Sequence, residues 1–130
     1  MNKELNKQTG NLGESLSSKY LEKLGFLIVE RNYKKKFGEI DIIASRDAEL
    51  HFIEVKSVSC ENLSGIENLT NKPEDKVTRE KQRKISITAE TYLAEQGITD
   101  KRIIMDIFTV FIDKSTKKAV IKPLWDIVFT

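Results

Sequence analysis

The stretch from Phe37 to Ser57, "FGEIDIIASRDAELHFIEVKS", constrains the fold more than any other part of the chain. Two segments rich in β-branched residues, 40–44 and 50–58, are joined by the polar turn "SRDAE". This pattern predicts an antiparallel hairpin. Each predicted strand also carries charged side chains within its apolar run, which packing alone does not explain.

Side chains alternate across a strand, so the charged residues fall on defined faces. The two predicted faces of the first strand are Ile40, Ile42 and Ala44 on one side, and Glu39, Asp41 and Ile43 on the other. In the second strand, Phe52, Glu54 and Lys56 share a face. A turn centred on residues 47–48 pairs Ile43 with Phe52, Asp41 with Glu54, and Glu39 with Lys56.

Two directly opposed carboxylates, Asp41 and Glu54, repel at a cost of up to about 1 kcal/mol. A divalent cation between them reverses this, because Mg²⁺ binds carboxylate oxygens and keeps several waters that a substrate can replace. Lys56 on the same face would orient such a water or neutralise a phosphate. These residues therefore predict a site for phosphodiester hydrolysis. The alternative is an exposed, salt-bridged hairpin in which Lys56 pairs with Glu39.

Periodicity elsewhere predicts two helices. Apolar residues recur every four positions over residues 12–24, which indicates a first helix. A second helical stripe spans residues 85–93; Asp75 or Thr78 is expected to cap its start and Gly97 to end it.

Three more segments read as strands, namely residues 26–31, 103–112 and 119–121. The element order is then α-β-β-β-α-β-β. This order predicts an α/β fold, a mixed sheet with helices packed on its faces.

Length and composition narrow the class of protein. The chain has 130 residues, which suits one domain. With a single cysteine, Cys60, and a single histidine, the chain cannot form an internal disulfide or a cysteine/histidine zinc site. No stretch is long and apolar enough for a signal peptide or a membrane span, so a cytoplasmic protein with no membrane partner is expected. The net charge of +2 excludes a histone-like binder but allows a local basic patch.

Several segments resemble a known family. They are "GNLGESLSSKYLEKLGF", "ERN" at residues 30–32, "GEIDII", "FIEVK" and "KQRKISITAETYL". Together they are similar to the YraN-like uncharacterised family of restriction-endonuclease-like nucleases, with a D…E-x-K motif, related to Holliday-junction resolvases. The resemblance implies a single nuclease-like domain over residues 1–130, with a restriction-endonuclease-like mixed β-sheet flanked by α-helices.

The resemblance also implies roles for individual residues. Asp41 and Glu54 would bind Mg²⁺ or Mn²⁺, Glu14 would reach toward the metal, and Lys56 would assist catalysis. Gln82 matches a polar position beside the active site; for Glu14 and Gln82, exposed helix positions are the alternative. The implied function is a metal-dependent endonuclease acting on DNA, including branched or structured DNA. The alternative is an inactive nucleic-acid-binding accessory module that retains the fold.

Basic residues indicate where nucleic acid would lie. They precede the hairpin and crowd the start of the second helix: Arg31, Lys34, Lys35 and Lys36, then Lys76, Arg79, Lys81, Arg83 and Lys84. Such residues bind phosphates without reading sequence. Tyr33 and Phe37 lie among them, either to stack on an unpaired base or to pack at the sheet edge.

Two further expectations concern a loop and a partner. The polar segment from Ser57 to Asp75 leaves the second hairpin strand and is either a flap over the substrate or disordered. Resolvase relatives act as dimers, so the C-terminal edge strand, with Trp125 and Phe129, is a candidate surface for a homodimer.

Overall fold

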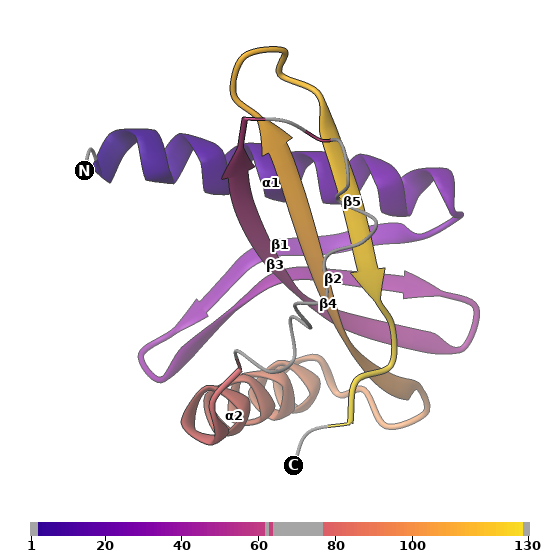
Figure 1. Cartoon of the computed structure of the whole chain (residues 1–130). Helices are drawn as coiled ribbons and strands as arrows, with labels where there is room; N and C mark the ends of the chain where they lie inside the picture. Colours follow the sequence, from indigo (N-terminus) through magenta and orange to yellow (C-terminus); the bar gives the residue numbers. More distant parts are fainter. Residues whose placement is uncertain (1–2, 62, 64–76, 129–130) are drawn as a thin grey trace.

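The structure, a computed structural model, describes residues 3–61, 63 and 77–128 (Figure 1). Its elements follow the order α-β-β-β-α-β-β, which confirms the predicted α/β class. They are α1 (Lys3–Lys23), β1 (Leu27–Lys35), β2 (Gly38–Arg46), β3 (Glu49–Cys60), α2 (Arg79–Gln96), β4 (Arg102–Asp113) and β5 (Ala119–Leu124).

The strands form one five-stranded sheet in the order β1-β2-β3-β4-β5. The β1–β2, β2–β3 and β4–β5 pairs are antiparallel, while β3 and β4 are parallel. Parallel neighbours need a crossover connection, and α2 lies between β3 and β4 in the chain. The predicted mixed sheet is therefore confirmed.

The two helices cover opposite faces of the sheet. Leu21 of α1 packs in a cluster with Ile42 and Ile53, whereas Ile85 of α2 packs in another with Ile43. Ile42 and Ile43 are adjacent on β2, so their side chains project to opposite faces. Figure 1 shows α1 running across the strands and α2 beside the turn that joins β1 to β2.

Local sequence sets the ends of α2 as predicted. The Thr78 hydroxyl accepts a hydrogen bond from Lys81 N at 3.1 Å, which satisfies one of the free N–H groups of the first turn. Gly97 ends the helix with φ 64°, a left-handed conformation that glycine adopts without strain. The alternative cap, Asp75, lies outside the described residues.

Several elements are longer than the sequence indicated. Helix α1 begins at Lys3, because the polar residues before Leu12 contain no helix-breaking proline. Strand β1 continues to Lys35 and β3 to Cys60, because each pairs there with a neighbouring strand. The expected strand end at Val58 is therefore two residues short, and the proposed loop does not begin at Ser57, because residues 57–60 are strand. Residues 62 and 64–75 of the proposed flap lie outside the described part of the chain.

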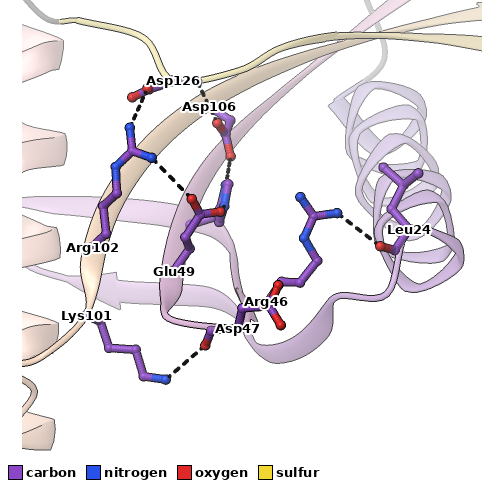
Figure 2. Close-up of polar contacts among 9 residues, drawn as sticks. Leu24, Arg46, Asp47, Glu49, Lys101, Arg102, Asp106 and Asp126 are labelled. Atoms are coloured by element: carbon purple, nitrogen blue, oxygen red, sulfur yellow. Dashed lines mark hydrogen bonds and ion pairs between the residues drawn. The ribbon is translucent and has the colours of Figure 1, made fainter.

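A polar network ties the chain after β5 to the starts of β3 and β4 (Figure 2). Arg102 contacts Glu49 at 3.3 Å and Asp126 at 3.0 Å. Asp106 accepts a hydrogen bond from Asp126 N at 2.9 Å, and its other oxygen lies 2.6 Å from His51 Nδ1. The C-terminal segment is thus held both by the buried Asp106 and by an exposed ion pair with Arg102.

The C-terminal edge is also packed within the chain. The Trp125 ring stacks on Phe26 with ring centroids 5.9 Å apart and meets Phe108 edge-on at 5.1 Å. Phe129 lies outside the described residues, and a homodimer through this edge stays a prediction. In the described part of the chain, no helix has the length and apolar character needed to cross a bilayer.

Candidate active site

The β2–β3 hairpin has the predicted register over the part of its ladder nearest the turn. Ile43 pairs with Phe52, and the ladder runs from Arg46↔Glu49 to Ile42↔Ile53. It ends there, one step before the predicted pairing of Asp41 with Glu54. Instead, the backbone N–H of Val55 donates a hydrogen bond to Asp41 Oδ2 at 2.8 Å. The Asp41 side chain thus satisfies a β3 backbone donor where ladder pairing stops.

The same position interrupts the side-chain alternation of β2. Ile40 lies in the cluster against α2 together with Ile43, whereas Ile42 lies in the cluster against α1. The predicted shared face of Ile40 and Ile42 is therefore wrong. On β1, Asn32 lies between the pairs Arg31↔Ile42 and Tyr33↔Ile40, across from Asp41, with φ 54°. The left-handed backbone conformation of Asn32 occurs where the side chains of β2 change face, and asparagine adopts this conformation more readily than most residues.

Burial and charge together raise the pKa of Asp41 to about 8. The main cause is loss of solvation, and the second is the neighbouring charge of Glu54; Glu14 adds to the effect. The hydrogen bond from Val55 N opposes it. Asp41, Glu54 and Glu14 therefore form one electrostatic neighbourhood, although they come from three elements. A cation placed among them would relieve both the repulsion and the lost solvation.

Helix α1 brings Glu14 to this neighbourhood, not to an exposed flank. Its side chain is 13% exposed, and Oε1 lies 3.8 Å from Arg31 Nη2. Burial raises the pKa of Glu14, and a hydrogen bond with Asn32 and the charge of Arg31 counteract this. Among the described residues, Glu14 Oε1 is a buried oxygen without a hydrogen-bond partner.

The position of Glu14 depends on the preceding glycine. A Cβ on Gly13 would lie 1.9 Å from the Ser57 Oγ, so a larger residue here would force Ser57 or α1 to shift. Gly13 thus supports the close approach of α1 to β3, a role that the sequence did not predict. A glycine next to a candidate site glutamate within a helical pattern was the signal available.

Glu54 and Lys56 line a small cavity of about 80 Å³, whose wall also includes Val77 and Lys81. Lys81 Nζ lies 2.9 Å from Glu54 Oε1 and so neutralises that carboxylate. Lys81 is thus brought to the acidic residues and does not line the lysine-rich surface described below. Lys56 and Glu54 thus border the same cavity, although Val55 between them borders it as well.

Gln82 lies at the start of α2, half-buried. Its Nε2 donates a hydrogen bond to the Val77 carbonyl at 3.0 Å. Val77 lines the cavity beside Glu54, whereas Gln82 is not among the lining residues. This places Gln82 where it supports the cavity wall and fixes the first turn of the helix.

The carboxylates fit a cation that needs few protein ligands. Within the described ranges, no group of three or more histidine, cysteine, aspartate or glutamate side chains is arranged to hold a metal ion. Mg²⁺ is commonly bound by one or two carboxylates, with waters and substrate oxygens completing its shell. Asp41 and Glu54 match that requirement, and Glu14 Oε1, which has no hydrogen-bond partner among the described residues, fits a role toward a metal-bound water.

Five of the nine predicted basic residues gather between the β1–β2 turn and α2. A cavity of about 510 Å³ there is lined by Lys34, Lys35, Lys36, Phe37, Arg83 and Lys84, among others. We call this cavity the basic groove. Arg31 does not line it, because its guanidinium faces Glu14 and donates to Ser15 Oγ at 3.4 Å. Tyr33 is a core residue that packs edge-on against Tyr92, so of the two aromatic residues only Phe37 reaches the groove.

The order of elements and the mixed five-stranded sheet are those of a restriction-endonuclease-like α/β protein. Comparison with known sequences makes this specific. The chain belongs to the uncharacterised protein family UPF0102, whose sequence model matches residues 13–112. The matched segment includes Glu14, Asp41, Glu54, Lys56 and Gln82.

Relatives from three bacteria show how much of the chain is shared. A UPF0102 protein of Dictyoglomus thermophilum is 42% identical over 113 residues, which cover 86% of this chain and 89% of the relative. One from Desulforapulum autotrophicum is 37% identical over 102 residues, 78% of each chain. One from Alkaliphilus metalliredigens is 34% identical over 113 residues, 87% and 93% of the two chains.

Proposed function

We propose that the protein is a metal-dependent endonuclease that hydrolyses phosphodiester bonds in DNA, including branched or structured DNA. The observation that carries this proposal is the meeting of Asp41 and Glu54 in one half-buried neighbourhood beside Lys56. A fold gains nothing from neighbouring like charges alone. A hydrolytic centre for phosphodiesters uses such carboxylates to hold a cation.

In this proposal Asp41 and Glu54 hold Mg²⁺ or Mn²⁺. When bound, the cation supplies positive charge to the scissile phosphate and lowers the pKa of its bound water. The chain's own groups do the rest. Val55 N–H fixes Asp41 Oδ2 by a hydrogen bond, so a ligand would meet the other carboxylate oxygen, Oδ1. Lys56, on the wall of the cavity with Glu54, places an ammonium group where phosphoryl oxygens or the attacking water would lie.

A panel of linear, flapped and four-way-junction DNAs, incubated with Mg²⁺ or Mn²⁺, tests the proposal. We expect cleavage that chelator abolishes and that Asp41→Ala and Lys56→Ala each reduce at least 100-fold, in line with removal of one electrostatic group from a catalytic site. Lys19→Ala, on the exposed surface of α1, is the matched control and should cut like wild type. Cleavage that survives chelator, or that is equal in wild type and Lys56→Ala, would refute the mechanism.

One contact favours a second candidate function. The Lys81–Glu54 ion pair at 2.9 Å occupies a carboxylate that the endonuclease needs for its metal. In an accessory module that binds nucleic acid without cutting it, this pair would be permanent. That function predicts DNA binding that is the same with chelator and with Mn²⁺, together with no cleavage of any substrate in the panel.

A further inference from the structure

The basic groove lies between the β1–β2 turn and α2, and Gly38 lines it where the turn packs closely on the helix. A Cβ on Gly38 would lie 2.4 Å from Thr88 Oγ1 and 3.1 Å from the Lys84 carbonyl oxygen. The turn therefore sits directly on the helix. Residues on either side of the contact, Phe37 and Lys84, line the same cavity.

The groove is strongly cationic, and part of its charge is unneutralised. Lys35 is paired with Glu95 at 2.6 Å, and Lys84 lies 3.6 Å from Glu80. Lys36 and Arg83, by contrast, make no ion pair within the described part of the chain, and both are exposed. Two free cations facing one cavity favour an anionic ligand with more than one negative group.

The groove also presents an apolar surface beside these cations. Phe37 is 41% exposed and lies in the turn directly after Lys36; Ile87 on α2 is also 41% exposed. An exposed aromatic ring among phosphate-binding cations is the arrangement on which unpaired bases stack. In a duplex the base faces are already stacked on one another, so this ring has no partner there.

We propose that the basic groove binds an unpaired strand of nucleic acid, with its phosphates along Lys36, Arg83 and Lys84 and one base stacked on Phe37. Its volume of about 510 Å³ is in the range of pockets that hold small ligands, about 300–1,000 Å³, which suits a short segment of single strand. This inference deepens the proposed function and rests on it for the identity of the polymer. The groove continues toward the acidic residues, because Glu39 lines it and its charge also raises the pKa of Asp41.

Binding of a fluorescent oligothymidylate, measured by anisotropy in chelator, tests the groove without any cleavage. Phe37→Leu keeps an apolar side chain but removes the ring, and should weaken single-strand binding by roughly 5-fold to 150-fold, the measured range for one stacked base. Phe37→Tyr should retain it. Binding of a fully paired duplex should change less than 2-fold for both variants. Equal losses for single strand and duplex, or no loss with Phe37→Leu, would overturn the proposal.

The phosphate contacts are tested separately, by the salt dependence of single-strand binding. The double variant Lys36→Ala/Arg83→Ala should reduce the salt slope of single-strand binding by about 1.4, or about 0.7 for each contact. The control Lys23→Ala/Lys114→Ala removes the same charge from exposed positions outside the groove and should leave the slope unchanged. Polyglutamate is the competing probe: if it binds as tightly as the oligonucleotide and Phe37→Leu has no effect on either, the groove takes an acidic peptide and the proposal fails.

Failure of this inference is distinct from failure of the proposed function. If Asp41→Ala abolishes cleavage while Phe37→Leu leaves single-strand binding intact, the endonuclease stands and the groove assignment falls. If Phe37→Leu selectively weakens single-strand binding but no DNA is cut, the groove assignment stands and the accessory module is the better function.

Discussion

Asp41 accepts a hydrogen bond from the backbone N–H of Val55 at 2.8 Å, immediately beyond the last ladder pair of β2 and β3, Ile42↔Ile53. A side chain here replaces a backbone carbonyl as the acceptor for a strand N–H. The two strands can therefore separate without leaving a buried donor unsatisfied. The separation places the carboxylate of Asp41 between the strands, close to Glu54, and so builds the acidic neighbourhood.

Removing the charge of Asp41 is expected to stabilise the apo protein. Because the pKa of Asp41 is raised to about 8 from its ordinary 3.8, the folded state binds the proton more tightly than the unfolded chain. Its contribution to stability therefore falls as the pH rises from about 4 to about 8. Asp41→Asn keeps an oxygen for the Val55 N–H, and should raise the free energy of unfolding at pH 9 by at least about 1 kcal/mol, but by little at pH 4.

Urea denaturation in chelator at the two pH values measures this effect. Asp47→Asn is the matched control, since Asp47 is an exposed turn residue at φ 54°, a conformation that asparagine adopts readily. An Asp41→Asn variant that is neutral or less stable than wild type at pH 9 would support the salt-bridged hairpin and remove the physical basis for a metal centre.

Metal stabilisation should depend on Lys81. A cation that binds only the folded state adds about 2.7 kcal/mol when its concentration is a hundredfold above Kd. Lys81 competes for Glu54 across 2.9 Å, and partly exposed pairs of this kind contribute about 0.2–1 kcal/mol. Lys81→Ala should therefore lower the Kd for Mn²⁺ by up to about 5-fold, followed by Tm across a Mn²⁺ titration.

Lys84→Ala controls for the loss of a charge one turn along α2. It should leave the Kd for Mn²⁺ near the wild-type value, because Lys84 pairs with Glu80. Asp41→Asn should abolish the metal-dependent rise in Tm. The same Mn²⁺ response in Asp41→Asn and wild type would place any bound metal elsewhere in the protein.

Two glycines of α1 should respond in opposite ways to alanine. Gly10→Ala places its Cβ in open space and should stabilise the helix by up to about 1 kcal/mol. Gly13→Ala places its Cβ 1.9 Å from Ser57 Oγ, and should destabilise the protein by about 1–3 kcal/mol through overpacking.

Thermal melts of the two variants test this contrast, and Ser57→Ala provides a rescue. Removing the Ser57 hydroxyl leaves the nearest Ser57 atom, Cβ, 3.2 Å from the added methyl group, so the double variant should recover part of the lost Tm. If Gly13→Ala melts at the wild-type temperature or above, α1 does not need this close approach to β3.

His51 should give the free energy of unfolding a second pH dependence, separable from that of Asp41. Burial lowers the pKa of His51, but hydrogen bonds and charges from Asp106 and Glu49 outweigh it, so the pKa is raised above 6.5. Its stabilising contribution is then fully present below pH 6.5 and lost as the pH rises through the folded-state value. Measured in the Asp41→Asn background, Glu49→Gln should move this loss of stability to lower pH.

Glu22→Gln, on the exposed face of α1, provides the control and should leave the pH profile unchanged. Equilibrium unfolding over pH 5.5–9 follows both variants. A profile that Glu49→Gln does not shift would mean that His51 stays neutral in the fold.

Much of the fold could be predicted because it depends on local pattern. Alternating apolar residues gave the β2–β3 hairpin, and Ile43↔Phe52 pairing confirms its register. Thr78 and Gly97 act as caps through their own side-chain and backbone chemistry. The ends of β1 and β3 were missed because polar residues extend those strands by pairing with neighbours, which depends on distant parts of the chain.

The site was harder to predict than the fold, for the same reason. Alternation suggested that Asp41 and Glu54 would be near each other. It did not predict the interruption of side-chain alternation in β2, the left-handed Asn32 opposite it, or the hydrogen bond from Val55 N–H to Asp41. Glu14 came only from the family resemblance, because its approach depends on the contact of Gly13 with β3. Such contacts join residues far apart in sequence, and periodicity within one element does not reveal them.

The β2 strand connects the basic groove directly to the acidic residues, with no loop between them. Phe37 precedes β2 by one residue and Asp41 is its fourth residue, so at strand spacing they are at most about 13 Å apart along the chain. A strand gripped at Phe37 would therefore meet the carboxylates at a distance set by covalent bonds. If the proposed endonuclease binds its strand in this way, β2 would set the distance from the stacked base to the cut, and lengthening the segment between these two residues would shift the cut position along the strand.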